Sequence, residues 1–429
     1  MAAMMRLQEV DLSLGRRFAW CVFLAMVPLL AFRFFQPDPY FPDEYAHYDV
    51  MATVATGDVP MRFSQASGKT ADLFACTDLR FGAPLLCGQR GQDASRLPWL
   101  GENAASAAGI FFHQVEGRVA SAISQSADVA LITVLRGLSL GWTLALALVA
   151  VWLSTLVGAS GAGSVAVGLL CVTNPLVLSQ SAVIQTDVAA ACLALAAIAV
   201  ALVRAPALRC IVASSTLATL GLLTRWSALI APVSLLALQW YTGLWRTRAL
   251  RCLVPAIPVL LAAVLAALDN VLRGGLASNG LQDQYVREHW DQNPVIAVMQ
   301  AWIRIPVTLS YPFSSSPARP GAGMLEAAWA CLVTATVCVV VAGSRSPRGA
   351  PSRWGALASG AIAYLVGMPA ITIVTLMAMG IPLFHQPRYL LPGVLLAIVL
   401  VASRPRTERY YIAASGGLWV TTGAFILLG

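Results

Sequence analysis

The sequence is short of charge. Of its 429 residues only 11% are charged and Lys69 is the single lysine, whereas 58% are hydrophobic and the mean hydropathy is +0.73. A soluble domain carries roughly 25% charged residues. This balance excludes an ordinary soluble protein and predicts an all-α polytopic membrane protein.

Several catalytic signatures are missing as well. The chain has no Walker-type phosphate loop, no His-Glu-x-x-His, no Cys-x-x-Cys pair and no Gly-x-Ser-x-Gly. These absences remove the parts needed for soluble-type nucleotide, zinc or serine-hydrolase chemistry. We also find no internal repeat, no long low-complexity segment and no soluble domain.

The net charge of +8 does not indicate a nucleic-acid partner, because the arginines are scattered in short loops between apolar runs. That pattern is typical of membrane topology. Arg16 and Arg17 precede the first candidate span, residues 18–35, and place the N-terminus in the cytoplasm. No small-x-small cleavage site follows this run, so we interpret it as a span and not as a signal peptide.

The apolar runs predict about eleven transmembrane helices with an external C-terminus. The run 210–242 is too long for one span and is interrupted at Arg225. Two short helices that meet externally at Arg225 keep the arginines at 246–251 inside, as the positive-inside rule requires. The other runs are 137–157, 162–181, 187–203, 252–272, 321–342, 355–379, 389–402 and 411–428.

Residues 1–429 therefore form a single transmembrane domain with two external segments, 36–128 and 273–320. The first is a large loop expected to carry surface helices. The last of these helices covers 111–128 and is expected to lie in the membrane interface, because its apolar residues recur at helical spacing. They are Phe111, Phe112, Val115, Val119 and Ile123.

The most informative stretch, FPDEYAHYDVMATVATGDVP, spans residues 41–60. Proline followed by two acids predicts a helix start, and Gly57 predicts its end. Residues four apart share a helix face, so Asp43 is expected beside His47 and Glu44 beside Tyr48. Neighbouring helical residues point about 100° apart, so Asp43 and Glu44 are not expected to flank one bond as a glycosidase pair does.

The predicted topology gathers scattered polar residues at the external ends of spans: Asp43, Glu44, His47, Asp187, Arg225, His385 and Arg388. Asp187 has two interpretations, a helix cap formed with Thr186 or a second carboxylate in the cavity of Asp43. Arg225 either snorkels to the interface or holds a lipid phosphate.

Arg388 with Tyr389 is either an interfacial anchor or a phosphate contact. Lone loop histidines are often merely solvated, which applies to His385, His113 and His289. Of nine cysteines, only Cys76 and Cys87 fall in the large external loop. A disulfide between them is expected if the outside is oxidising, and two unpaired thiols are the alternative.

Four motifs together resemble the GT-C superfamily of integral-membrane glycosyltransferases: PDEYAHYDV, Thr186-Asp187, TRW at 224–226 and HQPRYLLP. Pro-Asp-Glu-x-x-His-Tyr with a late Gln-x-Arg-Tyr-x-x-Pro is similar to an uncharacterised bacterial branch of that group. The similarity in layout covers nearly the whole chain. Its motifs are short, so they indicate the superfamily and not the substrate.

The resemblance implies roles for individual residues. Asp43 matches the first-loop acid that acts as general base or positions a metal, with Glu44 as its neighbour. Asp187 resembles the acid of the second external loop. Arg225 and Arg388 match cations near the lipid-phosphate pocket, where His385 and Tyr389 also belong, and His47 joins the catalytic group. A divalent metal on Asp43 and Glu44 is one option.

The expected function is inverting transfer of a sugar from a polyprenyl-phosphate donor to an envelope glycan or lipid, on the external face of the bacterial inner membrane. The resemblance leads us to expect a member without the soluble C-terminal domain of larger relatives, with acceptor recognition left to the external loops. A transporter or flippase of a lipid-linked or small anionic substrate is the alternative. A noncatalytic scaffold leaves the acidic helix unexplained.

Overall fold

The computed structural model describes residues 44–61, 64–75, 87–103, 105, 111–181, 183–203, 208–241, 255–273, 322–344, 353–379 and 387–428, with helical positions 19, 20, 22, 23, 26, 27 and 30 before them. This described part is all-helical, as predicted, with fourteen α-helices and no strand. The helices are α2 (Glu44–Ala55), α3 (Gly68–Phe74), α4 (Phe111–Ala127), α5 (Leu131–Leu156), α6 (Gly161–Thr173), α7 (Pro175–Gln180), α8 (Asp187–Leu202), α9 (Leu208–Thr224), α10 (Ile230–Tyr241), α13 (Ala256–Leu272), α16 (Ala322–Ser344), α17 (Arg353–Met379), α18 (Leu391–Ala402) and α19 (Pro405–Leu428).

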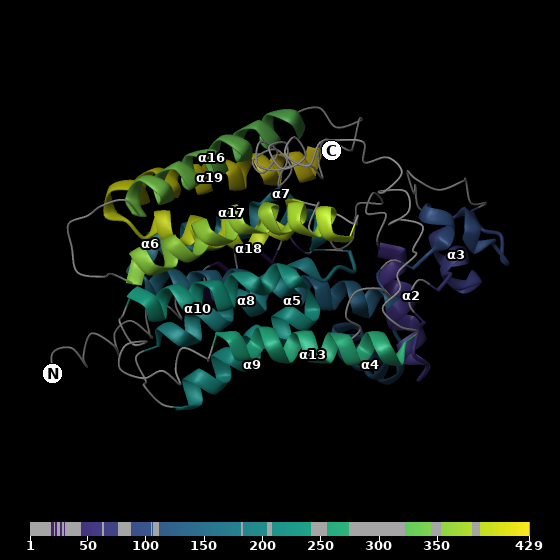
Figure 1. The fold of residues 1–429 in the computed structure, drawn as a ribbon. Coiled ribbons are helices and arrows are strands. Elements are labelled where there is room, and N and C mark those ends of the chain that lie inside the picture. The colour runs from purple at the N-terminus through teal and green to yellow at the C-terminus, as the bar shows by residue number, and fades with distance from the viewer. Residues whose placement is uncertain are drawn as a thin grey trace.

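The helices from α5 onward run side by side as a bundle (Figure 1). Two of them, α8 and α18, lie at its centre, because both are apolar around their whole circumference. A helix without a polar face must be covered on all sides. Accordingly α8 packs against α5, α9 and α10, and α18 packs against α16 and α17.

Among the described helices, α5 alone is both long enough and apolar enough to cross a membrane by itself. Seven further apolar helical segments are 10–17 residues long. The all-helical part of the fold prediction is confirmed.

Most helix boundaries follow the predicted runs, but α5 begins at Leu131 and α19 at Pro405, ahead of the predicted starts at 137 and 411. Helix α4 occupies the predicted surface helix 111–128, and the break at Arg225 is present, where α9 ends and a short 3-10 turn, Trp226–Leu229, leads into α10. The predicted span 162–181 is divided at Asn174, whose side chain accepts hydrogen bonds from the amides of Leu176 and Val177 and so starts α7.

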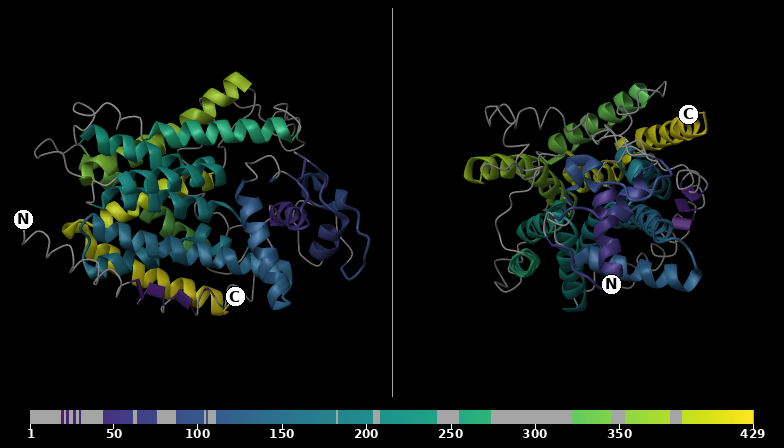
Figure 2. Two further views of the ribbon diagram at one scale, coloured as in Figure 1. Left: turned by 90° about the horizontal axis from the view of Figure 1, so that it is seen from below. Right: turned by 90° about the vertical axis from the view of Figure 1, so that its right-hand side faces the viewer.

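The helices of the first loop, α2 and α3, lie beyond one end of the bundle (Figures 1 and 2). They enclose a small core of their own that includes Tyr45, Phe74 and Leu97. Asp49 organises it: one carboxylate oxygen accepts from the amide of Ser67 at 2.9 Å and the hydroxyl of Thr70 at 2.7 Å, and the other from the amide side chain of Asn103 at 3.0 Å.

Arginines gather at the opposite end of the bundle, where α6, α17 and α19 begin. Arg404 stacks on the ring of Trp354 at 3.6 Å, and the amide of Ser160 donates to Glu408 at 2.9 Å. Arg353 donates to the carbonyl of Leu202. These contacts join the turns at this end to one another.

Helix α4 crosses α2 at very short range. An added Cβ on Gly117 would lie 2.8 Å from the carbonyl oxygen of Met51, closer than real Cβ atoms come to any neighbour. The glycine therefore permits this crossing, and α4 holds α2 against the bundle through its own contacts with α5.

Gly117→Ala should destabilise the protein. Ala is better than Gly in a helix by about 1 kcal/mol, but here the methyl group collides with backbone, which cannot rotate away. We expect a lower thermal unfolding temperature in detergent. Gly137→Ala is the matched control, because nothing lies within 4 Å of a Cβ at that position of α5. Equal unfolding temperatures for the two variants would contradict the crossing.

Candidate functional site

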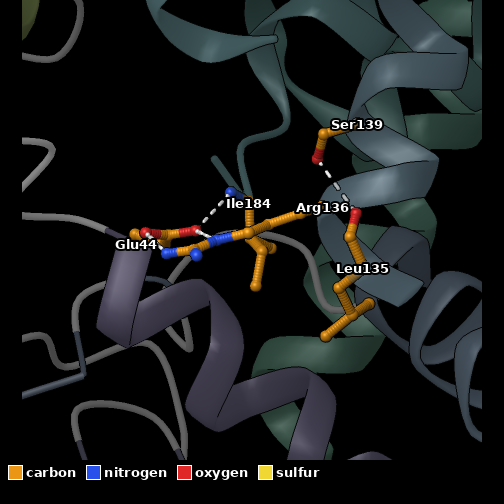
Figure 3. Close-up of polar contacts among 5 residues, drawn as sticks. All are labelled: Glu44, Leu135, Arg136, Ser139 and Ile184. Carbon is orange, nitrogen blue, oxygen red and sulfur yellow. Dashed lines mark hydrogen bonds and ion pairs between the residues drawn. The ribbon is translucent and has the colours of Figure 1, made fainter. Parts of the chain in front are cut away.

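Glu44 is the first residue of α2, and its side chain fastens that helix to the bundle. Its two carboxylate oxygens accept from Nε and Nη2 of Arg136 on α5, both at 2.9 Å (Figure 3). The backbone amide of Ile184, in the turn between α7 and α8, donates to the same carboxylate at 3.1 Å. Glu44 is buried.

This geometry gives Glu44 a clamping role. A carboxylate held by a bidentate guanidinium and a backbone amide has few lone pairs left for a metal or a substrate. Arg136 was not predicted from the sequence. Its position next to the start of the run 137–157 was the available signal, because an arginine near a span needs a partner or a task.

His47, one turn further along α2, contacts His113 of α4. Nδ1 of His47 lies 2.8 Å from Nε2 of His113, the rings are nearly coplanar at 8°, and both side chains are buried. The interpretation of His113 as a solvated loop histidine is therefore wrong. Two neutral imidazoles can share one hydrogen bond in this way, with one ring donating and the other accepting.

Asp187 and Arg225, distant in sequence, form an ion pair. Oδ1 of Asp187 lies 3.1 Å from Nε of Arg225, and Oδ2 accepts from Nε2 of Gln180 at 3.2 Å. Asp187 begins α8, but the side chain of Thr186 makes no capping hydrogen bond. The interpretation of these two residues as a helix cap is therefore wrong.

The guanidinium of Arg225 also stacks on Tyr389, with its carbon 5.5 Å from the ring centroid. A second tyrosine, Tyr364, donates to the carbonyls of Ser227 and Tyr389 and so ties the 3-10 turn after Arg225 to the start of α18. None of the described residues accepts a hydrogen bond from the two terminal nitrogens of Arg225, whose side chain is 14% exposed. The guanidinium is thus held at Nε by Asp187 and across its face by Tyr389. Its outer edge, formed by the two terminal nitrogens, is open.

Other predicted residues have no described side chain. Asp43, His385 and Cys76 lie outside the described residues, and for Arg388 only the backbone, in a 3-10 turn, is described. Cys87 is disulfide-bonded, and its pairing with Cys76 stays a prediction. Among the described residues, no group of three His, Cys, Asp or Glu side chains is placed to hold a metal ion.

Glu116 of α4 is a buried acid that the sequence did not single out. Its carboxylate accepts from the indole nitrogen of Trp142 at 3.1 Å. Burial raises its pKa to about 8, and the hydrogen bond from Trp142 opposes that rise. The group therefore stays largely protonated at neutral pH, beside the interface of α4 with α5.

No protein-family model, curated protein or solved structure matches this chain.

Glu44→Gln should lower stability by about 3 kcal/mol, because it leaves Arg136 without its counter-charge at a largely buried joint. The thermal unfolding temperature in detergent measures the effect. Asp58→Asn is the control, since Asp58 is exposed and follows α2 closely in the chain. An unchanged unfolding temperature for Glu44→Gln would show that the clamp contributes little.

The pKa of Glu116 predicts a pH dependence. The folded-state pKa lies above the unfolded value, so this group contributes stability that is complete below about pH 4.5 and lost as pH rises towards 8. Each pKa unit corresponds to about 1.4 kcal/mol. Glu116→Gln should remove this slope and unfold at a higher temperature than the wild type at pH 8. If the unfolding temperatures of the two proteins changed equally with pH from pH 5 to 9, the raised pKa would be contradicted.

Proposed function

We propose that this chain is a polytopic inner-membrane glycosyltransferase of the GT-C type. It moves a sugar from a polyprenyl-phosphate donor to an envelope glycan or lipid on the external face, with inversion. The observation that carries the proposal is the convergence of Glu44, Arg136, the turn at 184–187, Arg225 and Tyr389 at one end of the bundle, although they come from distant parts of the chain.

A membrane location is supported by the outward side chains of the bundle. Helix α13 exposes large apolar residues along its length, including Leu260, Val264, Leu268 and Leu272. Helix α4 likewise exposes Phe111, Val115, Val119 and Ile123, spaced four apart, which supports its placement in the membrane interface. Exposed apolar surface of this extent is unfavourable in water.

The orientation follows from the two polar ends. Arg353, Arg404, Arg406 and Arg409 lie at or near the end opposite α2, and the positive-inside rule makes that end cytoplasmic. The end that carries Glu44, Asp187 and Arg225 is then external, where a lipid-linked sugar emerges from the bilayer.

The proposed chemistry assigns Arg225 to the donor phosphate. Its open outer edge provides two parallel N–H donors for phosphate oxygens. Asp187 at Nε and the ring of Tyr389 fix the plane of the guanidinium. As the bond between the anomeric carbon and the phosphate oxygen breaks, the departing lipid phosphate gains negative charge, which the guanidinium stabilises.

Asp43 is the proposed general base. It removes the proton of an acceptor hydroxyl while that oxygen attacks the anomeric carbon from the face opposite the phosphate, which inverts the configuration. Asp43 directly precedes Glu44 in the sequence. In this proposal Glu44 is a positioning residue. Loss of transfer in the presence of chelator would add a divalent metal to this site.

Asp43→Asn should reduce transfer about 100-fold or more, because it removes the base and keeps the shape of the side chain. The measurement is transfer of radiolabelled sugar from a panel of polyprenyl-phosphate sugars in membranes, with and without chelator. Asp58→Asn should retain wild-type transfer. Full activity of Asp43→Asn would exclude Asp43 as the base. Wild-type protein that binds these donors without transferring sugar, and moves them across liposome membranes, would favour the transporter.

A further inference from the structure

The turn between α7 and α8 contains buried polar atoms without partners. Gln185 is 3% exposed, yet neither its amide nitrogen nor its amide oxygen has a hydrogen-bond partner, and the hydroxyl of Thr186 has none. The amide oxygen of Gln180 and the hydroxyl of Ser227, also buried, are in the same state. Most buried polar atoms in proteins are hydrogen-bonded, so a group of unsatisfied atoms in one place requires an explanation.

Loose packing of the turn does not explain these unsatisfied atoms, because contacts on both sides hold the turn in place. On one side the amide of Ile184 donates to Glu44, and on the other Asp187 contacts Arg225 and Gln180. Gln185 and Thr186 lie between these two attachments. The fold therefore keeps a complete carboxamide and a hydroxyl in an unfavourable environment at the centre of the candidate site.

The charges around the turn indicate what these atoms would bind. Among the described residues that contact this turn, each acid is offset by an arginine, Glu44 by Arg136 and Asp187 by Arg225, so their charges balance. A carboxamide both donates and accepts, and so does a hydroxyl. This combination suits a neutral ligand that carries several hydroxyl groups and does not suit a second anion.

We infer that Gln185 and Thr186 form a subsite for the hydroxyl groups of a sugar, and that Gln185 determines which sugar is accepted. The inference rests on the proposed function, because it takes that sugar to be the one carried by the donor. Arg225 holds the phosphate. It contacts Asp187, which lies two residues after Gln185 in the sequence. A sugar phosphodiester then satisfies both parts of the site, whereas a bare lipid phosphate satisfies only one.

The test measures stability and binding on purified protein in detergent. Gln185→Leu should raise the unfolding temperature without ligand, because it removes buried polar atoms that have no partner. A short-chain polyprenyl phosphate and its hexosyl and pentosyl phosphodiesters serve as probes for calorimetry. The wild type should bind one or more glycosylated probes about tenfold more tightly than the bare phosphate. Gln185→Leu should lose that difference and bind the bare phosphate normally.

Two further variants complete the design. Arg225→Gln should weaken binding of all the probes, and Gln125→Leu, on the exposed face of α4, should change neither stability nor binding. A lower unfolding temperature for Gln185→Leu would overturn the inference, since it would mean that the carboxamide stabilises the fold through buried water. So would an unchanged preference for glycosylated probes in that variant. Wild-type protein that binds bare polyprenyl phosphate and gains nothing from any sugar would overturn the subsite alone, and protein that binds no probe would overturn the proposed function with it.

Discussion

The contact between Glu44 and Arg136 determines how helix α2 meets the helical bundle. A buried carboxylate at the start of α2 would be strongly unfavourable without a counter-charge. Arg136 supplies that charge with two parallel hydrogen bonds, and the amide of Ile184 uses the same carboxylate. One side chain therefore fixes α2, α5 and the turn between α7 and α8 in relation to one another.

The second ion pair is joined to the first through one short turn. Ile184, whose amide donates to Glu44, lies three residues before Asp187, which pairs with Arg225. Arg225 can be met there only because α9 stops at Thr224 and the chain turns before α10. An unbroken helix of the same residues would carry the guanidinium past this end of the bundle. The break is thus a requirement of the site as well as of the topology.

The sequence was sufficient for the positions of the helices and insufficient for their partners. The break at Arg225, the start and end of α2, and helix α4 follow from local signals such as apolar periodicity, glycine at positive φ after a helix and acids in a first turn. The pairs Glu44 with Arg136, His47 with His113 and Asp187 with Arg225 span tens of residues. They depend on which helices pack together, and no local pattern encodes that.

Hydrogen-bond satisfaction separates the roles of the buried polar residues at this end of the molecule. Asp49 accepts three hydrogen bonds, two from the start of α3 and one from Asn103, and the fold uses its whole carboxylate. The carboxylate of Glu44 is likewise occupied, by Arg136 and the amide of Ile184. Arg225 is restrained by Asp187 and Tyr389 and keeps its outer edge open, and Gln185 has both polar atoms without partners. A fold can tolerate such a residue only if other contacts compensate for it, and those contacts are the clamp of Glu44 with Arg136 on one side and the ion pair of Asp187 with Arg225 on the other. The division between satisfied and unsatisfied groups is therefore the physical reason to assign the first two residues to the scaffold and the last two to a ligand.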